Sequence, residues 1–178
     1  MADIHPTAIV AETAQLGEGV QIGPFAIIEE GAQIGDGTEF QVRAHSIVGT
    51  DCFIGSGTLI GAEPHYIGFD RKTKSWVRVG DNNIIREYVM LHRSIEEDGK
   101  TILGDDNFLI NGTHFGHDCI VGNSNVFANN VLLGGHVEMG NNCFLGGGSV
   151  YHQFVRIGDY VMAQGLAGTS KDVPPSTM

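Results

Sequence analysis

The sequence predicts an all-β protein folded as a parallel β-helix. Aliphatic or aromatic residues recur every six positions through most of the 178 residues, and glycine commonly follows them. A helix repeats its apolar positions about every 3.6 residues and a half-buried strand every two, so a period of six fits neither. Each hexapeptide makes one short strand and a corner. Three such units close a coil of about 18 residues, which gives a triangular prism.

The repeat runs along the chain in two long stretches. The first has apolar positions at Ile4, Val10, Leu16, Ile22, Ile28, Ile34, Phe40, Val48, Ile54 and Ile60. The second runs in phase from Val79 to Ala163, with only Glu97 out of pattern. Coils stack at the strand spacing of ~4.8 Å, so residues one coil apart in the sequence lie above one another. About eight coils are expected, with amide ladders pairing Asn107 with Asn125 and Asn111 with Asn129.

Two polar segments interrupt the repeat within what we predict to be one domain, residues 1–178. They cover about 63–78, with the only tryptophan, and 94–101. Loops on a rigid scaffold commonly carry recognition. We therefore expect these two excursions to lie beside the functional site.

Composition and charge exclude several classes of protein. The formal net charge of -11 argues against nucleic acid, which requires a basic surface. No stretch approaches the ~20 apolar residues of a membrane span, and the first residues lack the features of a signal peptide. We predict a cytoplasmic protein without membrane insertion. The cysteines occupy one position of the repeat and are expected to be small core residues: Cys52, Cys119 and Cys143.

A histidine cluster lies within the repeat. His114, His117 and Asp118 are close neighbours in the sequence, and a histidine beside a carboxylate is the pairing that makes a base near neutral pH. A step of one coil places His136 beside Asp118 and Gly135 beside His117. The same arithmetic predicts that His114, His117, His136 and His152 share one face near one corner.

Motifs along most of the chain resemble the UDP-N-acetylglucosamine O-acyltransferases that open lipid A biosynthesis. They are HPTAIV, IGPFAII, IREYVMLHR, NGTHFGHDCIVGN, NNVLLGGHV, VYHQFVRIG and SKDVPP. The resemblance implies a left-handed β-helix that forms homotrimers and uses neither a cofactor nor a metal. The family continues after the PP motif into a helical domain, which the fold expected for residues 1–178 does not include.

The resemblance also implies an activity and its residues. An acyl group would pass from acyl carrier protein to a hydroxyl of a UDP-amino sugar. His117 would be the general base, Asp118 would orient it, and the Gly135 N–H would hold the oxyanion. The substrate-binding residues would be His114, His136, His152, Gln153 and, at the acyl channel, Gly165. The chain reads HYIGF where the family has a QDLKY-like stretch, so Tyr66 and Gly68 replace its sugar-binding Asp and Lys.

Other functions fit the same residues. The GHDCIVG motif also resembles nucleotide-sugar acetyltransferases that use acetyl coenzyme A. A zinc-dependent hydratase could use His114, His117 and His136 as ligands. A non-catalytic β-helix trimer would retain the hexapeptides alone.

Cations gather around the excursions of this acidic chain. They are Arg71, Lys72, Lys74, Arg78, Arg86, Arg93 and Lys100. Exposed cations steer acidic partners and raise association rates. The pattern predicts a basic strip that receives the carrier protein or the diphosphate of the nucleotide sugar.

Overall fold

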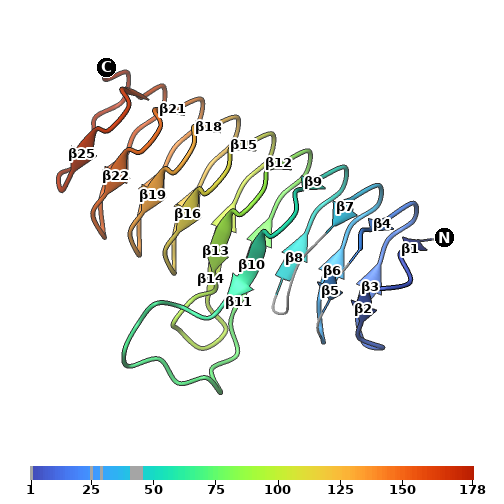
Figure 1. The fold of residues 1–178 in the computed structure, drawn as a ribbon. Coiled ribbons are helices and arrows are strands. Elements are labelled where there is room, and N and C mark those ends of the chain that lie inside the picture. The colour runs from blue at the N-terminus through green and yellow to red at the C-terminus, as the bar shows by residue number, and fades with distance from the viewer. Residues whose placement is uncertain (1, 25, 29, 41–45) are drawn as a thin grey trace.

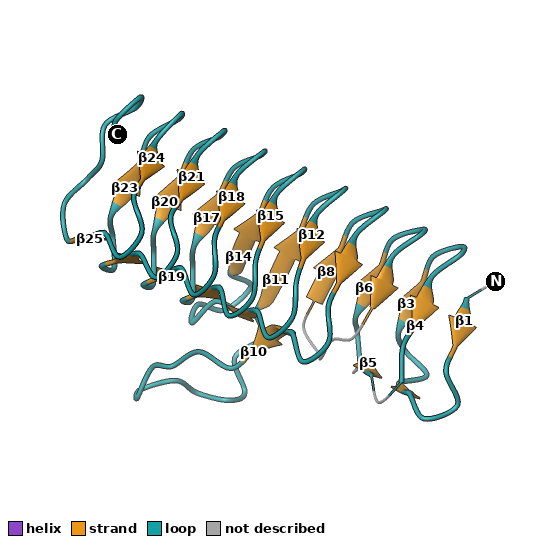
Figure 2. Ribbon diagram, turned by 45° about the horizontal axis from the view of Figure 1, so that its top comes forward, coloured by secondary structure: helices purple, strands orange, loops and turns teal. Residues whose placement is uncertain are grey.

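The computed structural model describes residues 2–24, 26–28, 30–40 and 46–178, and these form the predicted left-handed parallel β-helix. All of its strand pairs are parallel, and Figure 2 shows strands and loops without a helix. In the described part of the chain, no helix is long and apolar enough to cross a bilayer.

Three faces of stacked short strands make the prism. The first face contains β1 (Asp3–Ile4), β4 (Gln21–Ile22), β7 (Glu39–Phe40), β9 (Phe53–Ile54), β12 (Ile84–Ile85), β15 (Phe108–Leu109), β18 (Val126–Phe127), β21 (Phe144–Leu145) and β24 (Met162–Ala163). The second contains β3 (Gln15–Leu16), β6 (Gln33–Ile34), β8 (Ser46–Val48), β11 (Trp76–Val79), β14 (Lys100–Leu103), β17 (Ile120–Val121), β20 (Glu138–Met139) and β23 (Arg156–Ile157).

The third face is divided into two sheets. One sheet pairs β2 (Ile9–Val10) with β5 (Ile27–Ile28). The other contains β10 (Leu59–Ala62), β13 (Met90–His92), β16 (His114–Phe115), β19 (Leu132–Leu133), β22 (Val150–Tyr151) and β25 (Gly168–Thr169). Between these two sheets the coil is short, because Ile34 pairs with Val48 before a full coil of about 18 residues. This is where the spacing of the repeat slips between Phe40 and Val48, and residues 41–45 lie outside the described part.

The repeat predicts the core because its apolar positions point into the prism. From Ile22 to Ile157 nearly all described members are buried, including Phe115 and Phe127, whose ring centroids are 5.1 Å apart. Ile4 is 43% exposed, since no coil covers the N-terminal end. All three cysteines are buried and unpaired, as predicted.

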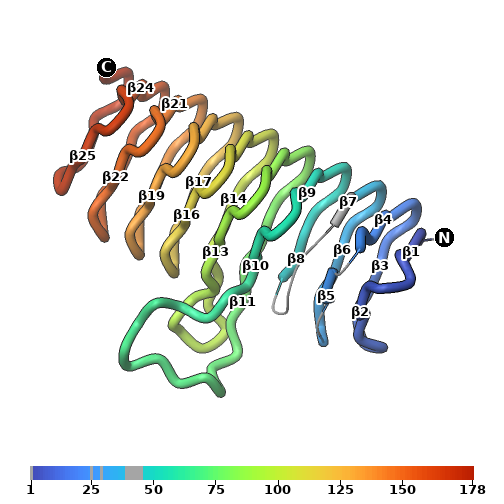
Figure 3. The backbone as a smooth tube through the Cα atoms, in the orientation of Figure 1, coloured from blue at the N-terminus to red at the C-terminus, as the bar shows by residue number. Residues whose placement is uncertain are grey.

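Two loops leave the prism at neighbouring positions. The longer one connects β10 to β11 and projects from the wall, and the shorter one connects β13 to β14 beside it (Figures 1 and 3). The longer loop lengthens the step between the paired residues Val48 and Val79, and the shorter loop lengthens the step between Leu91 and Phe115. Where a loop intervenes, residues that stack on successive coils are therefore separated in the sequence by more than the regular step of about 18 residues.

A ladder of buried amides runs along one corner. Asn107 Oδ1 accepts from the Asn125 N–H at 2.9 Å, which confirms that predicted pair, and Asn83 Oδ1 extends the ladder to the Asn107 N–H at 2.9 Å. Asn125 continues it through the Cys143 N–H at 2.9 Å. The second predicted ladder was wrong, since the described structure has no amide hydrogen bond between Asn111 and Asn129.

We expect Asn125→Leu to destabilise the protein by about 2–4 kcal/mol. The change leaves the buried Cys143 N–H and Gly140 carbonyl without their side-chain partner, and each such group costs about 1–3 kcal/mol. Urea unfolding at fixed protein concentration measures the effect. Asn123→Ala, which removes an exposed corner amide, is the control and should cost less than about 1 kcal/mol. Equal losses in both variants would contradict the importance of burial.

Candidate functional site

The centre of the candidate site is the corner between β16 and β17. His117 Nδ1 lies 2.8 Å from Asp118 Oδ2, and the two side chains are 14% and 13% exposed. Since the carboxylate can only accept, this contact places the proton on Nδ1 and leaves the Nε2 lone pair free. The pair is thus a partly exposed imidazole in the tautomer that a general base needs.

Asp118 is held by the shorter loop and by the next strand. Its Oδ2 also accepts from the Ile95 N–H at 3.2 Å, and its own N–H donates to Thr101 Oγ1 at 2.8 Å. The hexapeptide repeat does not predict either contact, because Ile95 and Thr101 both belong to the polar segment that interrupts it. These contacts fix the carboxylate that orients His117.

The next coil adds His136, as the spacing predicts. The His136 N–H donates to the His117 carbonyl at 2.9 Å, and the two rings meet edge to face with centroids 5.0 Å apart. His136 Nε2 lies 3.9 Å from Asp118 Oδ2, and Phe154 stacks on the His136 ring with centroids 4.6 Å apart. His136 and Phe154 have φ of 59° and 66°. The same left-handed φ occurs at other corners of the prism, as at Tyr88, Tyr160 and Leu166, so it belongs to the geometry of the coil.

Two glycines make room at this corner. A Cβ on Gly135 would lie 2.7 Å from His117 Cε1, and one on Gly116 would lie 2.6 Å from the Gly135 nitrogen. Any larger residue at Gly135 must displace the His117 ring. Within the described residues, the Gly135 N–H donates to no acceptor. The imidazole and an unused backbone donor therefore lie side by side.

Three further predicted residues are not part of this group. His152 and Gln153 are exposed at the corner after β22, where His152 Nδ1 lies 3.3 Å from the Gln153 carbonyl oxygen. Gly165 follows β24 on the first face and lies at a different corner of the prism. One chain alone therefore does not bring Gly165 to His117.

His114 lies on the shared face as predicted, on β16, but it belongs to a second group of ring contacts. Its ring centroid lies 4.9 Å from that of His92 and 5.7 Å from that of His65. The His65 and His92 centroids are 4.2 Å apart. Burial, with smaller contributions from the charges of His114 and His65, lowers the pKa of His92 to about 4. Burial, followed by the charge of His65, also lowers the pKa of His114.

The longer loop is anchored by Arg93. Arg93 is 2% exposed, lies 4.7 Å from the centroid of the Phe69 ring and donates to Ser75 Oγ at 3.2 Å. Burial lowers its pKa. The anchored loop brings the Tyr66 ring centroid to 6.1 Å from that of His117. The family departure at Tyr66 thus lies beside the predicted base.

The structure removes some of the predicted cations from the basic strip. Arg93 is enclosed by the loop, Arg71 Nε pairs with Glu63 at 2.8 Å, and Arg86 pairs with Glu87 at 3.1 Å. Of the predicted members, those that are exposed and have no described ion pair are Lys72, Lys74, Arg78 and Lys100. They lie in the longer loop and on the adjoining strands β11 and β14. A smaller strip therefore remains.

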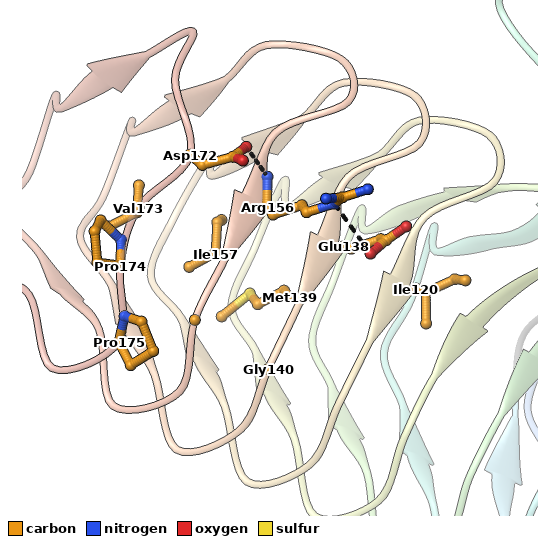
Figure 4. A pocket seen from close by; sticks show the side chains of 11 residues that line it. Ile120, Glu138, Met139, Gly140, Arg156, Ile157, Asp172, Val173, Pro174 and Pro175 are labelled. Carbon is orange, nitrogen blue, oxygen red and sulfur yellow. Dashed lines mark hydrogen bonds and ion pairs between the residues drawn. The ribbon is translucent and has the colours of Figure 1, made fainter.

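A groove of about 590 Å³ follows the second face towards the C-terminal end. Figure 4 shows Glu138, Arg156 and Asp172 along it, with Pro174 and Pro175 at one side. Arg156 Nε lies 3.6 Å from Glu138 Oε2. None of the predicted site residues lines this groove.

Comparison with known proteins shows that the chain is similar to acyltransferases, although no protein-family model matches it. An acyl-[acyl-carrier-protein]–UDP-N-acetylglucosamine O-acyltransferase of Thermodesulfovibrio yellowstonii is 42% identical over 183 residues, which cover 100% of this chain and 70% of the relative. The Synechocystis enzyme of the same name is 38% identical over 131 residues, and the match covers 74% of this chain but only 47% of that relative. The solved UDP-N-acetylglucosamine acyltransferase from Campylobacter jejuni superposes with a TM-score of 0.91 at 35% identity, covering 97% of this chain and 69% of that structure.

Proposed function

Because the chain belongs to the acyl-[acyl-carrier-protein]–UDP-N-acetylglucosamine O-acyltransferase family, we propose that it transfers an acyl group from acyl carrier protein to a hydroxyl of UDP-N-acetylglucosamine or a similar UDP-amino sugar. This is an early reaction of lipid A biosynthesis. The observation that carries the proposal is the His117–Asp118 pair beside the unused N–H of Gly135.

In the proposed reaction, His117 Nε2 takes the proton from the sugar hydroxyl as its oxygen attacks the thioester carbonyl. Asp118 holds the imidazole by accepting from Nδ1–H at 2.8 Å. The Gly135 N–H stabilises the oxyanion, an interaction worth roughly 3 kcal/mol in other acyl transfers. When the carbon–sulfur bond breaks, the proton on His117 passes to the departing thiolate, which restores the neutral base.

The other predicted residues would bind substrate along the walls beside this centre. His136 is placed by Phe154 next to His117, and His114, His152 and Gln153 lie on the same face or at its corner. Gly165 lies at another corner. Its proposed place at the acyl channel therefore requires a cleft between two subunits, which supports the proposed homotrimer. We also propose residues 1–178 as one hexapeptide-repeat domain acting in the cytoplasm without a cofactor.

The base role predicts that His117→Ala lowers kcat roughly 100- to 10,000-fold, the usual contribution of a positioned general base. The measurement uses acylated carrier protein and UDP-N-acetylglucosamine, with acyl coenzyme A tested as the alternative donor. Circular dichroism should show an unchanged fold, since the His117 side chain faces the site.

His5→Ala is the matched control, because His5 is an exposed histidine of the first coil whose described side-chain contacts are local, to Thr7. It should retain wild-type kcat. Full activity in His117→Ala would reject the base role, and transfer from acyl coenzyme A alone would favour the acetyltransferase alternative.

The remaining basic strip predicts the docking side of the carrier protein. Reversing Lys72 and Lys74 to Glu should raise KM for the acylated carrier at low salt and much less at high salt, because screening shortens such fields to ~10 Å at 0.1 M. The matched comparison uses single reversals: Lys72→Glu within the strip, and Lys171→Glu as the control. Lys171 is an exposed lysine near the C-terminal end of the prism. Lys171→Glu should leave KM nearly unchanged. A KM insensitive to both the double reversal and salt would place docking elsewhere.

A further inference from the structure

The cluster of His65, His92 and His114 has no role in the proposed transfer as a group. Ring nitrogens from these three side chains lie within 4.8 Å of one another. They come from three separate elements: the longer loop, β13 and β16. The chain thus brings three imidazoles together from well-separated positions in the sequence, at a point where the loop meets the prism wall.

His92 has the hydrogen-bonding geometry of a metal ligand. Its side chain is 1% exposed, and its Nδ1 lies 2.6 Å from the Glu63 carbonyl oxygen. The carbonyl can only accept, so Nδ1 carries the proton and Nε2 carries a lone pair. Nε2 is buried and has no hydrogen-bond partner among the described residues. A buried polar atom without a partner is costly, and a backbone carbonyl on the opposite nitrogen is the usual support of a metal-bound histidine.

The cluster is open to solvent on one side. His92 is buried and His114 is half-buried, whereas His65 is exposed, so an ion can reach the ring nitrogens from solvent.

We propose that His65, His92 and His114 form a binding site for one divalent transition-metal ion of the Zn²⁺ type. Three imidazole nitrogens suit zinc, with water completing a tetrahedron. Zn–N bonds of about 2.0–2.1 Å require nitrogens about 3.3 Å apart. The three ring nitrogens, which all lie within 4.8 Å of one another, would therefore be drawn together when the ion binds.

The ion would fasten the longer loop to the prism. His65 is in the loop, whereas His92 and His114 are on adjacent strands of the third face. Tyr66 follows His65 directly and lies beside His117. Metal binding would therefore fix the segment that carries the family departure next to the proposed base. The metal would act by positioning, and the proposal does not depend on the acyl transfer.

A second group, His117, Asp118 and His136, also has ligand atoms within 4.8 Å. The carboxylate of this group already has hydrogen-bond partners, because Asp118 Oδ2 accepts from both His117 Nδ1 and the Ile95 N–H. Among the described residues, no orphaned nitrogen is buried in this second group. The first group is therefore the better site.

Calorimetric titration of the chelator-treated full chain with Zn²⁺ tests the site. We expect one ion per chain in the wild type. His65→Gln removes an exposed ligand. Loss of an outer-shell partner weakens metal binding roughly 10- to 100-fold, and loss of this direct ligand should weaken Zn²⁺ binding by more than that. His136→Gln, which alters only the second group, should bind like the wild type.

Trypsin digestion provides the second readout, since the loop carries cleavage sites at Arg71, Lys72 and Lys74. Zn²⁺ should slow cleavage there in the wild type and in His136→Gln but not in His65→Gln. The proposal is overturned if the wild type binds no Zn²⁺, if His65→Gln binds as well as the wild type, or if His136→Gln is the variant that loses binding. None of these readouts requires catalysis, so they stand whether or not the transferase function holds.

Discussion

The backbone hydrogen bonds between successive coils are the constraint on which the structure depends. Hydrogen bonds run in both directions between successive coils: the Gly116 N–H donates forward to the Leu133 carbonyl at 2.8 Å, and the His136 N–H donates back to the His117 carbonyl at 2.9 Å. A slip of one residue would turn the apolar positions out of the core, so burial fixes the register. The candidate site inherits its geometry from this ladder, because His117 and Gly135 are held on adjacent coils by the same bonds that hold the fold.

This proximity restricts the backbone at the histidine corner. Gly116 and Gly135 leave no space for a side chain, and His136 and Phe154 adopt positive φ where the fold elsewhere often places Gly, Asn or Asp. The ladder on both sides holds these conformations in place. The conformation itself belongs to the fold, since Tyr88, Tyr160 and Leu166 adopt it at other corners.

The sequence predicted those parts of the molecule that obey the repeat. The period of six placed the core, and steps of one coil placed His136 near Asp118 and Gly135 beside His117. It failed where loops change the step, so the grouping of His114 with His65 and His92 was missed. Arg93 was misassigned for a related reason, since composition alone does not show that Phe69 and Ser75 enclose it. Gly165 follows β24 at a different corner from His117, so its role at the acyl channel stays a prediction.

A double-mutant cycle on kcat tests the central claim that the ladder presents His117 and Asp118 as one catalytic unit. The four proteins are the wild type, His117→Ala, Asp118→Asn and the double variant, assayed with acylated carrier protein and UDP-N-acetylglucosamine. In the proposed reaction Asp118 acts only by positioning His117, so Asp118→Asn should lower kcat strongly in the wild type and hardly at all when His117 is already Ala. An equal loss in both backgrounds would show that Asp118 works independently of His117 and would contradict the account.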